Sequence, residues 1–589
     1  MNIGMNKFTN KYFILFIVAF AFLLRVYHIG SIPPSLSWDE VSIGYNAYSI
    51  VKTGFDEHHR FLPLDTFIAY GDYKPPLPIY LAVPFIAVFG LNELSVRLPS
   101  ALFGTLTVLL TYFLVKELFA HRQKTMSRGR KYVTGDNEQW TEIHDSRQNT
   151  LSYAFCHMSS EVMPLLSALL LALSPWHINL SRAGFEANIA LFFVVLGIYL
   201  VFLSMRKPKI WYGALLPFVL AIYTFNSSRY FVPILGIGVL VIFWKSIRNQ
   251  WKHIAVGCLI AVITLLPIMP HLFSKEARLR FAEVNIFTDS SVVLTSNRRI
   301  EDAGNAWWAK IIFNRRVGYA REYILHYLDH FQPDYLFIKG DGNPKFSIQD
   351  VGQLYIMEAP FLVIGMFGLI RAFPSIGLFL LYWLLVSIIP AATARETPHA
   401  LRTLNSLPTW QIFVAYGICM VGSWIYFGQK TVNKKQNCLL LIAYCLLLLS
   451  IYIFCVVYYL HNYYRHYPIE YSGEWQYGYK DALVFIKPLE KQYDTIYMTE
   501  SIGRPYMYTL FYDKTDPQEF FRTKDASFDA AGFYHVYGFG NYRFVKDMPA
   551  DCQGKCLFIA PAGAEGKDAK ILKTIHLLNG NPILTVYEK

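Results

Sequence analysis

The segment 12–40, YFILFIVAFAFLLRVYHIGSIPPSLSWDE, decides the fold. It begins with an apolar run long enough to cross a bilayer as a helix, and it ends in two adjacent carboxylates, Asp39 and Glu40. Lys7 and Lys11 precede the apolar run, and no small-residue cleavage site follows it. We therefore interpret the segment as an uncleaved membrane anchor that leads into a polar outer loop.

The composition extends this interpretation to the whole chain. Of its 589 residues 54% are hydrophobic and 16% are charged, whereas soluble domains carry roughly 25% charged residues. This balance excludes a disordered chain and argues against a soluble enzyme. The net charge of +12 fits basic cytoplasmic loops. No basic run is interleaved with stacking aromatic residues, so we expect no nucleic-acid partner.

Hydropathy predicts an α-helical polytopic membrane protein with about eleven transmembrane helices. The predicted spans are 12–30, 98–119, 161–180, 188–205, 210–226, 230–246, 252–271, 353–371, 375–394, 408–428 and 437–460. Lys and Arg follow the second, fourth, sixth and tenth spans, which places all these loops on one side if the N-terminus is cytoplasmic. The opposite side then receives a first outer loop (31–97), a long outer loop (272–352) and the C-terminal tail.

Two segments do not fit the pattern of spans. Residues 76–91 are apolar but short and contain three prolines, and counting them as a span would place the basic loops outside. We therefore predict an interfacial or re-entrant helix there. The loop 120–160 is polar and lacks clear periodicity.

The tail changes composition and predicts a second module. Residues 1–460 form the membrane module, and 461–589 form an extracytoplasmic α/β domain. Helix-like stretches (478–491, 566–578) alternate with strand-like ones (494–499, 533–537, 556–560, 582–587). Cys552 and Cys556 are candidates for a local disulfide if the tail is outside, and free thiols are the alternative.

The first outer loop carries the strongest candidates for chemistry. Asp39 and Glu40 fit a general base or a metal site at the membrane surface. They also fit a helix start, with Ser37 as the cap. Lys74 lies before a Pro-Pro pair and suits a lipid phosphate, or it snorkels like an ordinary interfacial lysine.

Three further outer turns bring polar residues to the same face. The turn 174–188 contributes His177, Arg182 and Glu186, and the turn 395–402 contributes His399 and Arg402; Arg229 is a weaker candidate. Arg suits phosphate binding through paired hydrogen bonds, although polar residues also simply cap helix ends. Asp39, Glu186 and His177 are acceptable ligands for Mg²⁺ or Mn²⁺, but no spacing requires a metal, and no other cofactor is indicated.

The order of these motifs resembles the GT-C fold glycosyltransferases. More narrowly, it is similar to the branch that contains the protein O-mannosyltransferases and the lipid A aminoarabinose transferases. The resemblance rests on Leu24-Arg25, Trp38-Asp39-Glu40, 74–80 (KPPLPIY), 97–102 (RLPSAL), the Ser-Pro-Trp-His turn and 398–402 (PHALR). It covers residues 12–205 well and the rest in outline.

The resemblance implies an enzyme that takes a sugar from a polyprenyl phosphate on the extracytoplasmic side. It implies that Asp39, with Glu40 beside it, acts on the acceptor. Glu186 matches the second acidic position, where many relatives have Asp. Lys74 matches the phosphate-facing lysine, and Arg182, Arg229, His399 and Arg402 would assist in binding the donor.

These observations lead to one main hypothesis and two alternatives. The main hypothesis is inverting transfer of a hexose or pentose to a protein, lipid or glycan acceptor, in contact with membrane lipids of the plasma membrane. A transporter or flippase of lipid-linked saccharides would need charges deep within several spans, and a receptor would need only the tail. Paired carboxylates also serve glycosidases, but a hydrolase needs no many-span bundle.

Overall fold

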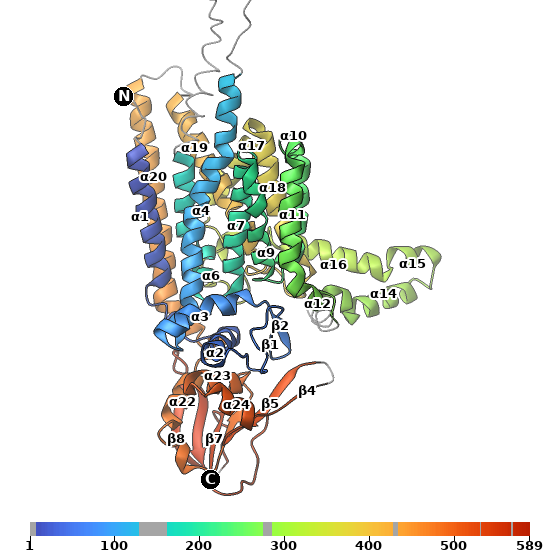
Figure 1. Ribbon diagram of the computed structural model, residues 1–589, viewed down its shortest axis with the longest axis vertical. Helices are drawn as coiled ribbons and strands as arrows, with labels where there is room; N and C mark the ends of the chain where they lie inside the picture. The colour runs from blue at the N-terminus through green and yellow to red at the C-terminus, as the bar shows by residue number, and fades with distance from the viewer. Residues whose placement is uncertain (1–6, 129–161, 275–284, 428–433, 530–531, 567–568) are drawn as a thin grey trace, which may run out of the picture.

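The computed structural model describes residues 7–128, 162–274, 285–427, 434–529, 532–566 and 569–589. A bundle of long helices occupies one part of the molecule, and a small mixed α/β domain lies beneath it (Figure 1). The N-terminus and the C-terminal domain lie at opposite ends of the bundle (Figure 1). The predicted loop 120–160 falls mostly outside the described residues.

The bundle is built from apolar helices. They are α1 (Lys7–Val26), α4 (Glu93–Arg128), α6 (Pro175–Arg182), α7 (Glu186–Ser204), α8 (Trp211–Ala214), α9 (Leu216–Ile222), α10 (Ser228–Ile247), α11 (Trp251–Leu265), α17 (Glu358–Ala372), α18 (Pro374–Ile388), α19 (Thr409–Phe427) and α20 (Lys434–His461). A helix Val162–Leu173 precedes α6, and the two are bent by 56°. The predicted fold class, a helical membrane bundle with a C-terminal α/β domain, is confirmed.

Six helical stretches among the described residues are long and apolar enough to cross a membrane, and a seventh arises if the bent pair counts as one span. The six are Glu93–Ala120, Glu186–Ser204, Ser228–Leu272, Pro374–Thr393, Leu404–Phe427 and Lys435–Glu470. The stretch 228–272 contains both α10 and α11. Two other predicted spans are helical but shorter or broken: 210–226 is α8 and α9, and 353–371 is α17. The predicted span 12–30 lies mostly in α1, a continuous helix of 20 residues.

The first outer loop covers the lower end of the bundle in Figure 1. It contains α2 (Trp38–Thr53), an antiparallel hairpin of β1 (Phe67–Ala69) and β2 (Asp72–Lys74), and α3 (Leu77–Phe89). The 13 residues of α3 reach only about 20 Å, which is too short to span. It lies across the lower end of the bundle, as an interfacial helix would (Figure 1).

The long outer loop forms an arm and a return segment. After α12 (Met269–Leu272), the helices α14 (Ser290–Asp302), α15 (Trp307–Ile312) and α16 (Arg315–Asp329) project sideways from the bundle (Figure 1). We call residues 290–329 the arm. The chain then turns through residues 334–355 beneath the spans and enters α17.

The C-terminal domain contains one mixed sheet of seven strands, in the order β4-β5-β6-β3-β7-β9-β8. The strands are β3 (Thr495–Thr499), β4 (Asp525–Phe528), β5 (Tyr534–Phe539), β6 (Tyr542–Val545), β7 (Cys556–Pro561), β8 (Lys570–His576) and β9 (Pro582–Glu588). The central strand β3 is parallel to β6 and β7. The helices α22 (Tyr479–Ile486), α23 (Pro505–Asp513) and α24 (Pro517–Thr523) lie between the sheet and α2 (Figure 1).

One apolar core joins this domain to the first outer loop. Val41, Ile43 and Ile79 of the loop are buried in the same cluster as Leu510 and Ile559 of the domain. The Tyr508 hydroxyl donates a hydrogen bond to the Leu36 carbonyl (2.8 Å), which fixes α23 against the start of α2. The two segments, distant in sequence, therefore form one packed body.

One predicted helix of the tail is wrong. Residues 570–576 form strand β8, which pairs antiparallel with β9, where the sequence pattern suggested a helix over 566–578. Ile571, Thr574 and Ile575 are β-branched and suit a pleated edge strand, and pairing with β9 outweighs the helical periodicity. The four predicted strands are present, and Cys552 and Cys556 form the disulfide left open by the sequence.

Candidate active site

The cap of α2 determines where the two adjacent carboxylates point. The Ser37 hydroxyl accepts a hydrogen bond from the Glu40 amide (3.4 Å), and the Glu40 carboxylate accepts one from the Ser37 amide (2.9 Å). This reciprocal capping box satisfies two amide groups at the helix start. Neighbouring residues of a helix point about 100° apart, so Asp39 faces a different direction from Glu40.

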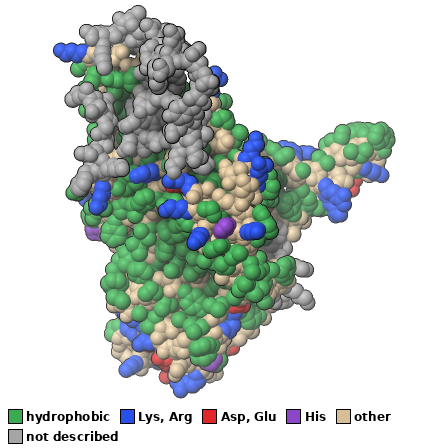
Figure 2. All heavy atoms as spheres, turned by 45° about the horizontal axis from the view of Figure 1, so that its top comes forward, with side chains coloured by type: hydrophobic (Ala, Val, Ile, Leu, Met, Phe, Trp, Pro, Cys, Tyr) green, Lys and Arg blue, Asp and Glu red, His purple; other side chains and the backbone are tan. Residues whose placement is uncertain are grey.

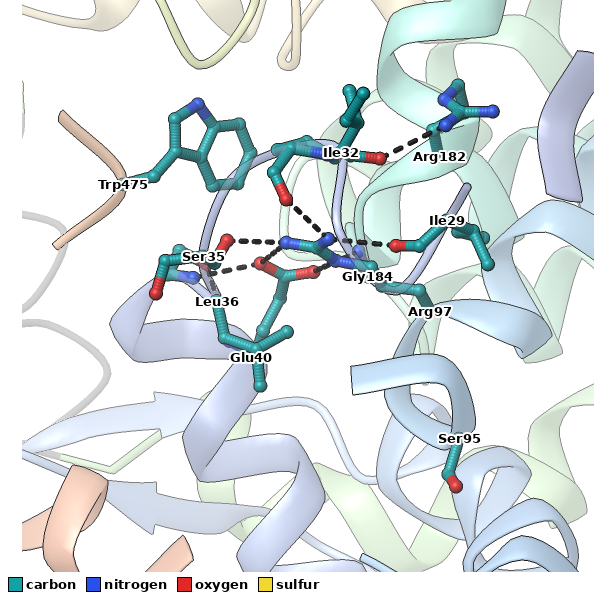
Figure 3. Close-up of polar contacts among 12 residues, drawn as sticks. Ile29, Ile32, Ser35, Leu36, Glu40, Ser95, Arg97, Arg182, Gly184 and Trp475 are labelled. Carbon is teal, nitrogen blue, oxygen red and sulfur yellow. Dashed lines mark hydrogen bonds and ion pairs between the residues drawn. The ribbon is translucent and has the colours of Figure 1, made fainter. Parts of the chain in front are cut away.

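Glu40 is fully buried in an ion pair with Arg97, whose Nε lies 2.8 Å from Oε1. The Gly184 amide donates to the same oxygen (2.9 Å). Arg97 also donates to the carbonyls of Ile29 (2.9 Å) and Pro33 (2.8 Å). Figure 3 shows this group, which joins the first outer loop to α4 and to the turn before α7. Both oxygens of the Glu40 carboxylate therefore have hydrogen-bond partners. Glu40 does not line the cavity described next.

A cavity of about 440 Å³ lies at the lower end of the bundle. Its walls come from the start of α2, the hairpin strand β2, the start of α7, the turn before α10, and the segment that follows α18. It brings together six of the residues singled out in the sequence: Asp39, Lys74, Glu186, Arg229, His399 and Arg402. Four outer segments that are separate in the sequence therefore meet at this cavity.

Lys74 lies among the acidic residues of this cavity. Its ammonium group is 2.8 Å from the Asp39 carboxylate and 3.0 Å from that of Asp72. Burial alone would lower the pKa of Lys74, but the charges of Asp39, Asp72 and Glu186 outweigh it and hold the pKa well above its usual value. Lys74 is therefore a fixed cation that orients Asp39, whose side chain stays 30% exposed.

The predicted metal-ligand set does not come together. His177 is buried against Arg25, with Nδ1 of His177 2.7 Å from Nη2 of Arg25, away from Asp39 and Glu186. Among the described residues, no group of three or more His, Cys, Asp or Glu side chains could hold a metal ion. The Lys74 ammonium already lies between the carboxylates, so the residues present do not fit a metal at this point.

Arg182 is the second predicted residue that lies outside the cavity. Its guanidinium is buried and donates to the Leu24 carbonyl (2.7 Å) and to the Tyr463 hydroxyl (3.1 Å). It also lies over the rings of Tyr463 and Tyr464. This arginine fastens α6 to α1 and to the end of α20, and it has no donor left that faces the cavity.

Arg229 has the opposite surroundings. It is the second residue of α10, and its side chain lines the cavity. Its Nε and Nη2 groups are buried without a hydrogen-bond partner within the part of the chain that the structure describes. A buried guanidinium with unused donors is costly unless a ligand supplies acceptors. Arg229 is thus a ready binding group for an anion.

The long outer loop holds the turn that carries His399. The Asp341 carboxylate accepts a hydrogen bond from the Ala400 amide (2.6 Å), and the His399 ring stacks on Phe346. Burial, with Arg402 and His330 nearby, keeps the pKa of His399 well below its usual value, so this ring is neutral at neutral pH. Burial also raises the pKa of Asp341 to about 6.

Sequence reasoning missed several residues of the cavity. Tyr230, His271 and Thr393 also line it. Asn226 and Ser227, in the turn before the candidate Arg229, and Tyr73, beside Lys74, line it as well. His271 stacks on Tyr73 (5.4 Å between ring centres), a long-range contact that leaves no pattern in the sequence.

Trp38 marks a second approach to Asp39, from the side of the C-terminal domain. The Lys345 ammonium lies over the Trp38 ring, 4.5 Å from its centre. Burial lowers the pKa of Lys345, which Asp39 and Glu474 partly offset. Gly503 of the C-terminal domain approaches the same ring closely enough that an added Cβ would lie 3.5 Å from it. Asp39 thus has Lys74 on one side and this aromatic platform on the other.

Known proteins share this architecture. ArnT from Cupriavidus metallidurans in its apo state superposes with a TM-score of 0.50 and 12% identity, over 98% of both chains. The same protein bound to undecaprenyl phosphate gives a TM-score of 0.48 at 11% identity, again over 98% of both chains. The Archaeoglobus fulgidus oligosaccharyltransferase gives 0.47 at 12% identity, over 87% of this chain and 64% of its own.

The family model of the dolichyl-phosphate-mannose-protein mannosyltransferases matches residues 15–126, which include Asp39, Lys74 and Arg97. No curated protein matches the chain in sequence. The fold is that of the GT-C membrane glycosyltransferases, and the first part of the chain is similar to the mannosyltransferase family. The resemblance predicted from the ordered motifs is confirmed.

Proposed function

We propose that this protein transfers a monosaccharide from a polyprenyl phosphate to an acceptor on the extracytoplasmic face of the membrane, with inversion at the anomeric carbon. The observation that carries the proposal is the cavity itself, which combines an ion-paired carboxylate with a guanidinium whose buried donors lack partners. The fold and the family-model match support the same class of reaction.

Asp39 acts as the base for the acceptor. Its carboxylate is partly exposed, oriented by Lys74, and adjacent to the Trp38 platform. It takes the proton of the acceptor nucleophile while the nucleophile forms its bond to the anomeric carbon. The bond from that carbon to the phosphate oxygen breaks in the same step, and its electron pair stays on the polyprenyl phosphate.

The leaving phosphate needs fixed positive charge. Arg229 and Arg402 line the same cavity as Asp39 and supply it without rearrangement. The neutral ring of His399 adds a polar contact but no charge. Glu186 opens α7 at the cavity wall, where its electrostatic interaction with Lys74 helps hold that cation in place.

The sidedness rests on the basic loops and on the tail. Lys and Arg follow the spans at the end of the bundle that carries the N-terminus, which favours a cytoplasmic N-terminus. The cavity, the first outer loop and the C-terminal domain then lie outside.

A transfer assay on purified protein tests this proposal. Polyprenyl-phosphate sugars and nucleotide sugars are offered to the wild type, to Asp39→Asn and to Asp65→Asn, a matched change in the same loop outside the cavity. We expect the wild type and Asp65→Asn to release polyprenyl phosphate, and Asp39→Asn to be at least ~10² times slower. Use of nucleotide sugars alone would contradict the donor class. Passage of lipid-linked sugar across liposomes without any transfer product would favour a flippase.

A further inference from the structure

The arm is an amphipathic element whose tip has no apolar partner among the residues that the structure describes. Trp307 is 76% exposed, and Ile311 and Ile312 are 62% and 55% exposed. Figure 2 shows hydrophobic side chains at the end of the arm beside Lys and Arg side chains. Aromatic and aliphatic side chains that cluster at one exposed site are typical of a surface that contacts a protein or a membrane.

Positive charge surrounds this apolar tip. From Trp307 to Arg316 the tip carries three basic residues and no acidic one, whereas the whole arm has six Lys or Arg and four Asp or Glu. The basic residues are Arg298, Arg299, Lys310, Arg315, Arg316 and Arg321, and the acidic ones are Glu301, Asp302, Glu322 and Asp329. A second copy of the chain would bring like charges together, so self-association through the tip is disfavoured. Trp and Ile beside Lys and Arg are the composition that helices use to lie on anionic membranes.

The last turns of α16 fix the level at which the arm leaves the bundle, and hence its position relative to the bilayer. The Tyr327 hydroxyl of α16 donates to the Leu385 carbonyl (2.9 Å), and His326 Nδ1 lies 2.8 Å from the Ala394 carbonyl. Leu385 lies within the apolar stretch Pro374–Thr393, in its last turns before the lower end. The arm therefore leaves the bundle where that stretch ends, and it runs across the direction of the spans (Figure 1).

The face between the two long helices of the arm carries more positive charge. α14 packs against α16, and an added Cβ on Gly318 would lie 2.9 Å from the Val292 side chain. Beside this contact a cavity of about 340 Å³ is lined by the guanidinium groups of Arg299, Arg321 and Arg395 and by the carboxylates of Asp289 and Glu322. Glu322 pairs with Arg321 (2.7 Å), so Arg299 and Arg395 are the groups that suit the phosphate of a lipid headgroup.

We propose that the arm lies on the outer surface of the membrane and binds anionic phospholipid. The apolar side chains of α15 insert among the headgroups, and the surrounding Lys and Arg pair with lipid phosphates. The arm thereby fixes the protein against the leaflet beside the segment 389–393, which also lines the candidate active site. This inference does not depend on the proposed transfer reaction.

The test uses the full chain in nanodiscs of phosphatidylcholine alone or mixed equally with phosphatidylglycerol. A fluorophore is placed at position 311 through an unnatural amino acid, and its quenching by nitroxide-labelled lipid is compared with quenching by aqueous iodide. A charge variant (Lys310→Gln, Arg315→Gln, Arg316→Gln) and an apolar variant (Trp307→Ser, Trp308→Ser) are compared with a matched control. The control (Lys491→Gln, Arg522→Gln, Lys546→Gln) removes three exposed charges from the C-terminal domain.

We expect lipid-side quenching to dominate in the anionic discs. The charge variant should lower the ratio of lipid-inserted to water-exposed tip at least ~10-fold in the anionic discs. Each basic group near an anionic surface contributes to the binding free energy of the arm. The apolar variant should expose the tip to iodide in both lipids, and the control should behave as the wild type. Free access of iodide to the wild-type tip in both lipids would overturn the proposal. The proposal would also be overturned if protection of position 311 from iodide depended on protein concentration, or on an added protein, and did not depend on the lipid.

Discussion

Asp39 and Glu40 are neighbours in the sequence but have different surroundings. Glu40 is buried with Arg97 and two backbone amides, whereas Asp39 is partly exposed and paired with Lys74. The structure thus separates a carboxylate that positions the loop from one that is available for chemistry. A buried pair of this kind gives little net stability, but removing one partner leaves the other charge unpaired.

Arg97→Ala should therefore destabilise the protein strongly. We expect a loss of about 3–5 kcal/mol in the free energy of unfolding, because the Glu40 carboxylate would remain buried without its cation. Thermal unfolding in detergent measures it. Arg206→Ala is the control, since its pair with Glu117 is more exposed and should contribute under about 1 kcal/mol. Equal effects of the two changes would contradict the role given to Arg97.

Asp341 provides a pH-dependent prediction. Its pKa rises from 3.8 to about 6 because it is buried, so the folded protein binds this proton more tightly than the unfolded chain does. Stability should then fall as pH rises from about 4 to about 6, by up to about 3 kcal/mol. Asp341→Asn should remove this component while keeping an acceptor for the Ala400 amide. Parallel stability curves for the wild type and the variant would contradict the prediction.

Sequence reasoning located the residues of the cavity better than it assigned their roles. Asp39, Lys74, Glu186, Arg229, His399 and Arg402 all face one space, because outer turns of a helical bundle meet at one end. Glu40, Arg182 and His177 were candidates on the same grounds, yet their partners are Arg97, Tyr463 and Arg25. Such partners lie far away in the chain, and a single sequence does not show them.

At the scale of elements, the contact between α2 and α23 links the bundle to the C-terminal domain. Gly44 lies where these helices approach most closely: an added Cβ would lie 2.5 Å from Phe511 Cε2 and 2.8 Å from Val96 Cγ2. Only a hydrogen fits there unless the Phe511 or Val96 side chain, or the helix that carries it, shifts.

Gly44→Val should thus push α23 away from α2 and weaken both the domain contact and the placement of Asp39. We expect a loss of about 1–3 kcal/mol in stability from overpacking, together with slower transfer. Gly236→Val is the control, because that helical glycine of α10 has open space around it. Thermal unfolding and initial rates measure the two effects. A Gly44→Val variant that behaves like the control would show that the helices are not in contact.

The elements that sequence predicted best are those with one strong signal. Long apolar runs gave the helices of the bundle, and alternating residues gave β3, β5, β7 and β9. The edge strand β8 was predicted as a helix because its apolar residues also fit a helical spacing, and its pairing partner β9 follows it in the chain. The arm was treated only as part of a long loop, since its helices carry polar and basic residues and lack the hydropathy of spans.

At the scale of the whole molecule, the disulfide and the basic loops point to the same sidedness. The pair Cys552–Cys556 lies in the C-terminal domain, at the opposite end from the N-terminus. Disulfides persist in oxidising compartments. The protein isolated from membranes should resist alkylation at these two positions until it is reduced, and should react at both afterwards. Alkylation of both C-terminal cysteines without reduction would place the domain on the reducing side.

The molecule as a whole divides the proposed reaction between two parts of one cavity. Asp39 lies at the start of α2 beside the Trp38 platform, while Arg229 lies at the start of α10 and Arg402 in the turn that follows α18. The base for the acceptor and the cations for the phosphate are therefore different groups. A substitution that removes the base should therefore leave the binding of the phosphate unchanged.

The affinity for polyprenyl phosphate, the proposed leaving group, tests this division most directly. It is measured in detergent for the wild type, Asp39→Asn and Arg229→Gln, with Arg206→Gln as a matched control at the opposite end of the bundle. We predict that Asp39→Asn and the control bind as the wild type does. Arg229→Gln should bind at least ~10-fold more weakly, because it loses a charge-assisted contact. Equal affinity of Arg229→Gln and the wild type would contradict the account.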